Sequence, residues 1–339
     1  MTASRAHSNC DILSIGSSTR LFDVIEILMG IDPAAMGRDV RLEGCMENLK
    51  GLKITWVEPL QWLHSHWNRK AHCSTRFFTP SLQRLEYSGC APLVLRFGAR
   101  SASLVELHVS HCHWSWLAVE KFSETLSQNR GLKTLTISNI TTFNPEDGIN
   151  SLGETPPNAA SPINLPSLTY MRVAEMRLYG VNTLLALFEA ENLEEWSLHN
   201  GLSLSRDRNF QEQRLSLLHS YPAVERIMFS FRLNHYHSYP EYGEVFHALD
   251  FVPNVQHVVV LSPSSDEFDT LLSILKDRKQ EGPNALTVKS ISSVTPQLAF
   301  QRVHSSPLKQ VNIHWKDIGL AAIDGTQEGF QMYAQALKC

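Results

Sequence analysis

The feature that most constrains the fold of this chain is a six-residue pattern that recurs along it. Apolar residues occupy its first, fourth and sixth places, with mostly polar residues between them. Because side chains alternate along a strand, the fourth and sixth residues point to one side, and one short strand cannot bury that side alone. We therefore expect the copies to form strands that stack side by side. The clear copies are LKGLKI from Leu49, LQRLEY from Leu82, LVELHV from Leu104, LKTLTI from Leu132, LTYMRV from Leu168 and LEEWSL from Leu193, and the looser ones are VERIMF from Val224, VQHVVV from Val255 and LKQVNI from Leu308.

The spacing of the copies is irregular. From Leu82 to Val255 they begin 22 to 36 residues apart, and a further step of 31 residues reaches Leu286, where LTVKSI is a degenerate match. CDILSI and VRLEGC, which begin at residues 10 and 40, are further partial copies. Proline-containing turns such as LPSL, YPAV and VPNV precede several copies, and proline favours an extended entry into the next segment.

The segments between the strands predict an outer layer. Residues 116–129, 181–190 and 268–279 have the apolar spacing of amphipathic helices. Residues 141–166 are rich in Pro, Asn, Gly and Ser without an apolar period, which predicts an inserted surface loop.

This pattern resembles the leucine-rich repeat, L-x-x-L-x-L-x-x-N/C, in an irregular form that runs from about Leu49, with Cys90 and Cys112 at the ninth position of their copies. The resemblance implies an α/β leucine-rich-repeat solenoid, a horseshoe with a parallel sheet on its concave face and helices and loops on its convex face. It divides the chain into an N-terminal cap with degenerate repeats (1–48), irregular repeats (49–318, with the loop insertion 141–166) and a C-terminal helical cap (319–339).

The stretch SLVELHVSHCHWSW raises the question of a metal site, because His108, His111, Cys112 and His113 lie close together in it. Zinc needs ligands that converge with fixed geometry. Strand alternation puts Cys112 on the inward side and His108 on the outward side. We therefore expect a structural strand, with no metal and no cofactor.

Composition and motifs argue against several classes of function. The formal net charge is −4, with 30 basic and 34 acidic residues, so the chain lacks the basic excess typical of nucleic-acid binding. The sequence contains no G-x-S-x-G, G-x-G-x-x-G, P-loop or H-E-x-x-H motif, and we expect no catalytic residues and no enzyme. No secretory signal and no apolar run of about 20 residues is visible, which predicts an intracellular protein of the cytoplasm or nucleus without a membrane partner.

The outward positions of the repeats are the candidate surface for a protein partner, since a curved sheet offers an extended contact area. A second candidate is the loop FRLNHYHSYPEYGE, because interface hot spots favour tyrosine, although such a loop can also pack on its own repeat. The candidates on the sheet are Arg84, Glu86, Glu106, His108, Thr134, Thr136, Tyr170, Arg172, Glu195, Ser197, His199, Arg226, Met228, His257, Gln310 and Asn312, and those on the loop are Tyr236 and Tyr239.

The irregular repeat lengths, the LPSL-type entries and the cysteines at the ninth position resemble the repeat region of F-box proteins, especially those of fungi. That resemblance implies the substrate-recognition subunit of a ubiquitin ligase, in which an N-terminal F-box binds a Skp-type adaptor. No F-box pattern of the L-P-x-E-[IL] kind occurs near the start, so adaptor binding is expected only if an F-box is present in the full-length protein. The alternative is a stand-alone repeat scaffold or regulator unrelated to ubiquitination.

Overall fold

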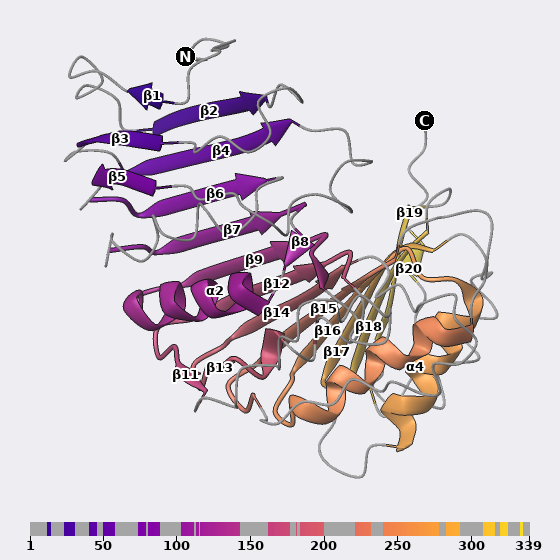
Figure 1. Cartoon of the computed structure of the whole chain (residues 1–339). Coiled ribbons are helices and arrows are strands. Elements are labelled where there is room, and N and C mark those ends of the chain that lie inside the picture. The colour runs from indigo at the N-terminus through magenta and orange to yellow at the C-terminus, as the bar shows by residue number, and fades with distance from the viewer. Residues whose placement is uncertain are drawn as a thin grey trace, which may run out of the picture. The chain divides into compact units, whose positions relative to one another are not determined.

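The fold is α/β, with long runs of parallel strands and few helices (Figure 1). The computed structural model describes residues 12–14, 24–30, 41–45, 50–57, 74–78, 81–88, 103–111, 113–114, 116–142, 162–176, 181, 184–199, 221–231, 240–277, 283–291, 308–315, 319–324 and 333–334. Within that part, none of the helices has the length and apolar character needed to cross a membrane. The chain forms two compact units: unit 1 is Met1–Leu168 with Leu187–Glu189, and unit 2 is Thr169–Ala186 with Ala190–Cys339.

Unit 1 contains a parallel sheet built from successive copies of the motif. Its strands lie in the order β2 (Val24–Gly30), β4 (Gly51–Val57), β6 (Arg84–Ser88), β7 (Glu106–Ser110) and β9 (Thr134–Ser138). The last four are the strands predicted from Leu49, Leu82, Leu104 and Leu132. The register of β2 against β4 identifies a copy that the sequence analysis missed, FDVIEI from Phe22.

The two partial copies proposed near the N-terminus do not join this sheet. CDILSI and VRLEGC contribute β1 (Ile12–Ser14) and β3 (Arg41–Cys45), which pair with β5 (Ser74–Phe78) in a separate three-stranded parallel sheet. Their assignment as stacked copies was therefore wrong. Apolar alternation indicates a strand but does not say which sheet the strand joins.

The remaining elements of unit 1 lie between the motif strands. Helix α2 (Trp116–Gln128) connects β7 to β9, as predicted, and buries Phe122 and Leu126. Two short parallel pairs, β8 (His113–Trp114) with β10 (Thr141–Thr142) and β11 (Ile163–Asn164) with β13 (Phe188–Glu189), lie beside it. The expected loop 141–166 thus carries β10 and β11 near its ends, and its residues 143–161 lie outside the described residues. The helix predicted over 181–190 was wrong at its end, which is β13.

Unit 2 continues the pattern with six parallel strands. They are β12 (Tyr170–Ala174), β14 (Glu195–His199), β15 (Arg226–Ser230), β16 (His257–Leu261), β17 (Ala285–Ile291) and β18 (Gln310–Trp315). Two antiparallel strands, β19 (Gly319–Asp324) and β20 (Tyr333–Ala334), follow. The helical cap expected over 319–339 is therefore wrong for the described residues of that segment, because the chain returns along β18 as a hairpin.

The register also corrects the copy that was placed at Leu286. Leu286 pairs with Val258 of β16 and Val311 of β18, both of which occupy the fourth place of their copies. The copy is therefore PNALTV from Pro283, which shares the first place with Val255 and Leu308. A proline at the first place concealed it from a search for leucine.

The longest helical segments among the described residues of unit 2 are η4 (Pro240–Phe251), a 3₁₀ helix, and α4 (Ser265–Asp277). The second helix was predicted at 268–279, and it begins three residues earlier. Its start is set by a capping box, in which the Glu267 N–H donates to Ser264 Oγ at 3.3 Å and the Ser264 N–H donates to Glu267 Oε2 at 2.6 Å. The Ser-x-x-Glu signal for this start was present in the sequence.

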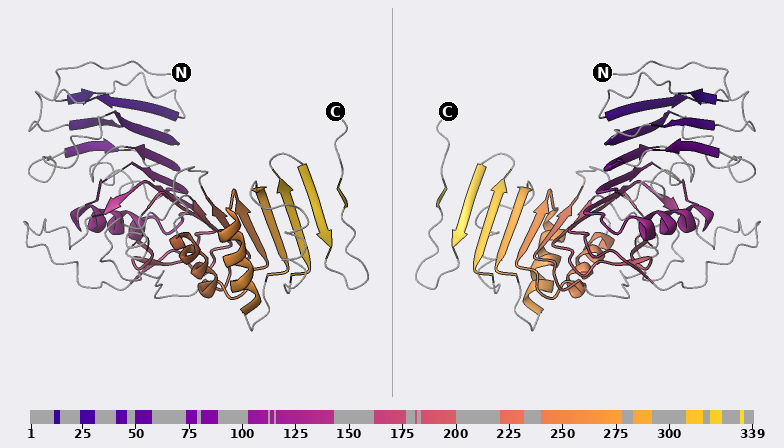
Figure 2. Two further views of the ribbon diagram at one scale, coloured as in Figure 1. Left: turned by 90° about the vertical axis from the view of Figure 1, so that its right-hand side faces the viewer. Right: turned by 90° about the vertical axis from the view of Figure 1, so that its left-hand side faces the viewer.

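The core of each unit lies where the motif places it. In unit 1, Leu107 and Val109 occupy the fourth and sixth places of β7 and are 0 % exposed. In unit 2, Trp196 fills the fourth place of β14, where it is 0 % exposed and its ring centroid lies 5.7 Å from that of Tyr221. Figure 2 shows α2 along one side of the unit 1 strands and α4 along one side of the unit 2 strands. The inward direction predicted for the motif is confirmed.

Backbone hydrogen bonds hold neighbouring copies in register at their second place. In unit 1 the N–H groups of Val105 and Glu106 both donate to the Gln83 carbonyl, at 2.7 and 2.9 Å. In unit 2 the N–H groups of Glu194 and Glu195 donate to the Thr169 carbonyl, at 2.9 and 3.0 Å. These contacts are made by the backbone and do not depend on the connecting segment, which explains how unequal spacings give one uniform register.

Four of the strands, β7, β9, β12 and β16, end in a similar turn. His111, Asn139, Glu175 and Ser262 all occupy the eighth place of their copies, and all have positive φ values, between 49° and 53°. That backbone conformation is costly for residues other than glycine. The N–H of His111 donates to the Ser138 carbonyl at 3.0 Å, at the point where the chain leaves the sheet.

The proline turns before the copies are present as predicted. The N–H groups of Leu168, Val224 and Val255 donate to the carbonyls three residues earlier, at 3.2, 3.2 and 3.3 Å. In each case proline follows the acceptor residue, at the turn position that suits its fixed φ. These turns deliver the first apolar residue of each copy to the core.

Candidate functional site

The third, fifth and seventh places of the motif face away from the core and form what we call the outward face. Across β6, β7 and β9, Arg84, Glu106 and Thr134 stand in one row. The fifth places form a second row, in which Glu86 is opposite His108. These side chains are partly or fully exposed, whereas those on the other side of the strands are buried. The predicted outward direction is therefore confirmed for the candidates of unit 1.

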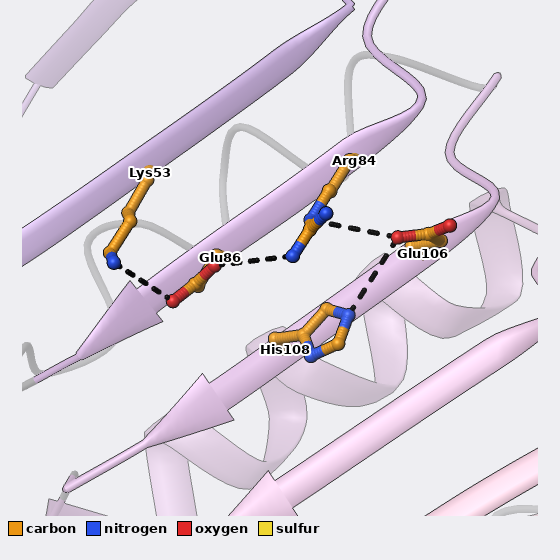
Figure 3. Close-up of polar contacts among 5 residues, drawn as sticks. All are labelled: Lys53, Arg84, Glu86, Glu106 and His108. Carbon is orange, nitrogen blue, oxygen red and sulfur yellow. Dashed lines mark ion pairs between the residues drawn. The ribbon is translucent and has the colours of Figure 1, made fainter. Parts of the chain in front are cut away.

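Four charged side chains and a histidine form a connected polar cluster on the outward face of unit 1 (Figure 3). Lys53 Nζ lies 3.4 Å from Glu86 Oε1, and Arg84 NH2 lies 3.6 Å from Glu86 Oε2. The Arg84 Nε atom lies 3.6 Å from Glu106 Oε2, and His108 Nε2 lies 3.8 Å from the same oxygen. Register accounts for these contacts, because Lys53 is directly opposite Glu86 and Arg84 is directly opposite Glu106.

The cluster balances its own charge. Its two carboxylates lie beside one lysine and one arginine, so the formal charge is zero when the histidine is neutral. The side chains are between 27 and 56 % exposed, and ion pairs of this kind are weak and screened by salt. The arrangement orders the surface of unit 1 without giving it a strong field.

The outward face of unit 2 carries a longer row at the third place. Tyr170, Glu195, Arg226 and His257 follow one another across β12, β14, β15 and β16. Arg226 NH1 lies 3.6 Å from Glu195 Oε2, so one ion pair links the two central strands of this row. All four predicted candidates in the row are at least partly exposed.

Two histidines on this face are held neutral. Burial, followed by the nearby Arg172 guanidinium, lowers the pKa of His199 to about 4. His199 Nε2 shares a hydrogen bond of 2.6 Å with Ser197 Oγ. For His257, burial and then the charges of Arg226 and Lys289 lower the pKa.

The fifth-place row of unit 2 is less open than expected. Ser197 was predicted as an outward candidate, but it is only 1 % exposed, and the equivalent Val259 on β16 is also 1 % exposed. Arg172, at the fifth place of β12, is exposed, and Met228 and Asn312 are partly exposed. Exposed and buried side chains therefore alternate along the row, and a partner can reach Arg172, Met228 and Asn312 more readily than Ser197 and Val259.

The histidine-rich stretch that suggested a metal site has other contacts in the structure. Asn139 Nδ2 donates to His111 Nδ1 at 2.8 Å, and His108 faces Glu106 in the polar cluster. In the described part of the chain no three His, Cys, Asp or Glu side chains come together as metal ligands would. Cys112 lies outside the described residues.

Two further candidates lie outside the described residues, and two charged residues of the outward face were missed. The two candidates are Tyr236 and Tyr239. Lys53 was missed although it holds the fifth place of the copy at Leu49, where the motif itself points outward. Lys289 was missed because the copy on β17 was assigned three residues too late. Its partner in register is Leu261, at the seventh place of β16.

Comparison of the sequence with protein-family models gives no match, and comparison with curated proteins gives no significant match.

Proposed function

We propose that the chain is a leucine-rich-repeat solenoid that recognises another protein with the outward, concave face of its sheet. In this proposal it is the substrate-recognition part of an F-box-type ubiquitin ligase subunit, acting in the cytoplasm or nucleus. The observation that carries the proposal is the strand register, which lines up the third, fifth and seventh residues of successive copies as rows on each unit. Rows of this kind give a repeat protein a large surface that varies independently of its core.

The composition of the rows supports a protein as the partner. Arg84, Glu86 and Glu106 combine both signs of charge, and Tyr170 adds an aromatic ring. Mixed charges of this kind give specificity to protein interfaces, whereas a nucleic-acid surface needs a basic excess.

The chain departs from the leucine-rich pattern at one place. The ninth position carries Ile140 and Met176, which are 2 and 1 % exposed, and Pro263, which is also buried, where the pattern has asparagine or cysteine. An apolar side chain there adds to the core but cannot bond to the backbone of the turn. The positive φ of the preceding residue supplies an alternative way to close the strand.

Binding by the outward face is tested with partners captured on the tagged full-length chain and then purified. Each is titrated against the wild-type chain, against Arg84→Ala/His108→Ala and Arg172→Ala/His257→Ala, and against the helix-surface control Lys276→Ala/Asp277→Ala. We expect at least one outward pair to lower the affinity about tenfold or more and the control to leave it unchanged. If a partner loses affinity only for the control variant, the proposal is overturned for that partner.

The proposed role in a ubiquitin ligase is tested by mixing a purified Skp-type adaptor with the full-length chain. An F-box-type function predicts a stable complex with cross-links to residues 1–50. No complex favours the second candidate, a stand-alone repeat scaffold, which is also supported by the missing L-P-x-E pattern.

A further inference from the structure

On unit 2 the charges of the outward face differ along the strands. At the third place they cancel, because Arg226 is paired with Glu195. Farther along the strands the charged side chains of this face are Arg172 on β12 and Lys289 on β17, and both are exposed. Among the described residues, neither has a carboxylate within ion-pair distance. In that part of the chain, the charges at the fifth and seventh places of this face are therefore both positive, and Glu175 follows at the eighth place of the copy on β12.

The histidines respond to that positive charge. The Arg172 guanidinium contributes to the lowered pKa of His199, and Lys289 contributes to that of His257. Burial is the larger cause of both lowered pKa values, and the neutral rings add polar and apolar contact area without adding charge. A negative group placed beside Arg172 or Lys289 would not have to displace any carboxylate of the described residues from them.

The surface between the two cations is short and partly apolar. Met228 on β15 and Leu261 on β16 lie between them in the strand order, and both are partly exposed. Four strand intervals separate β12 from β17, which corresponds to about 19 Å at the usual spacing of about 4.8 Å. An extended peptide that crosses the strands covers that distance in about six residues, at about 3.3 Å per residue.

We propose that the outward face of unit 2 binds an extended acidic segment of a protein partner, with two carboxylates about six residues apart that pair with Arg172 and Lys289 and apolar residues between them that contact Met228 and Leu261. This inference rests on the proposed function and assigns the class of partner. Unit 1 does not offer the same site, because Lys53 and Arg84 are already paired with carboxylates.

The test is a selection from a displayed library of random peptides, about twelve residues long, on the immobilised full-length chain, followed by titration of the individual peptides by fluorescence polarisation. We expect the selected peptides to carry two acidic residues about six positions apart. Their affinity should fall about tenfold or more in Arg172→Ser/Lys289→Ser and recover in Arg172→Lys/Lys289→Arg. The affinity should also weaken as salt is raised.

A matched control removes the same charge elsewhere. Arg130→Ser/Lys276→Ser takes two exposed cations from outside the outward face and should leave the affinity unchanged. Equal loss in both double variants reduces the effect to net charge and overturns the inference. Selected peptides without acidic pairs also overturn it. If those peptides lose affinity in Arg84→Ala/His108→Ala, the proposed function stands while the acidic-segment inference fails. If no selected peptide depends on any outward residue, both fail.

Discussion

The two units place the same backbone rows on their outward faces but use the charges differently. On unit 1, Lys53, Arg84, Glu86 and Glu106 are connected by ion pairs and cancel one another. On the outward face of unit 2, Glu195 pairs with Arg226, while Arg172 and Lys289 have no carboxylate within ion-pair distance among the described residues. The difference shows that the motif fixes where a side chain stands, while the residue opposite it in the next copy decides whether it is available to a partner.

The largest expected effect concerns the buried core of each unit, beneath its outward face. Leu107→Ala in unit 1 should cost about 2–5 kcal/mol of unfolding free energy, and Trp196→Ala in unit 2 about 3–5 kcal/mol, because both remove a fully buried fourth-place side chain. Urea unfolding measures the loss, and hydrogen exchange shows in which unit it occurs. A loss of unfolding free energy below about 1 kcal/mol at either residue would contradict a core role for the fourth place in that unit.

Trp196 also allows a milder replacement. Its buried Nε1 has no hydrogen-bond partner in the described structure, so Trp196→Phe keeps an aromatic ring beside Tyr221 and removes an unpaired donor. We expect it to cost much less than Trp196→Ala, and an equal cost would show that the indole volume alone matters.

The second prediction concerns acid and should affect unit 2. Between pH 6.5 and about 4 the unfolded chain protonates His199 while the folded chain does not, so stability is full above pH 6.5 and falls as the pH drops through this window. Because the side chain is partly exposed, we expect a loss of about 1 kcal/mol. Urea midpoints at pH 7 and pH 4.5 measure it, and His199→Gln should flatten the profile. An unchanged pH profile in His199→Gln contradicts the assignment.

The third prediction concerns the polar cluster of unit 1. Glu86→Gln removes the partner of both Lys53 and Arg84 and should cost about 0.5–1 kcal/mol at low salt. The difference from the wild type should shrink in concentrated salt, since screening weakens exposed pairs. A double-mutant cycle with Lys53→Met isolates the pair. A coupling free energy of zero at low salt would show that these contacts are not stabilising.

The smallest expected effect compares the turns that end the strands. Ser262→Gly in unit 2 should relieve the positive φ of 53° and change stability by a few tenths of a kcal/mol in the stabilising direction. His111→Gly in unit 1 should show no such gain, because it also removes the hydrogen bond with Asn139. Thermal unfolding of both variants measures the two changes in stability. A larger stabilisation in His111→Gly than in Ser262→Gly would contradict the prediction.

Much of this fold was predictable because the motif combines strand period with apolar content. The strands at Leu82, Leu104, Leu132 and Leu168 were placed correctly, and so was their inward side. The copies that were missed or shifted carry phenylalanine or proline at the first place, where a search for leucine does not find them. Only the pairing of neighbouring strands reveals these copies.

The candidate site was predictable in direction but not in contacts. Alternation alone puts Arg84 and Glu86 outward, but their ion pairs depend on which residue stands opposite in the next strand. The burial of Ser197 could not be predicted, because it depends on neighbouring side chains rather than on its own place in the motif. Lys289 was not predicted as an outward residue, because the copy on β17 was assigned three residues too late.

The shared carbonyl at the second place of each copy has a consequence for how such a chain changes in length. Every new strand needs from its predecessor only one backbone acceptor, such as the carbonyl of Gln83 or Thr169. A residue of any type at the second place can supply that carbonyl, because its side chain takes no part in the hydrogen bond. A whole copy can therefore be deleted or duplicated while the following strand still finds an acceptor of the same kind. Proteins of this architecture can thus lengthen or shorten their outward rows, one copy at a time, while the interior keeps the same arrangement.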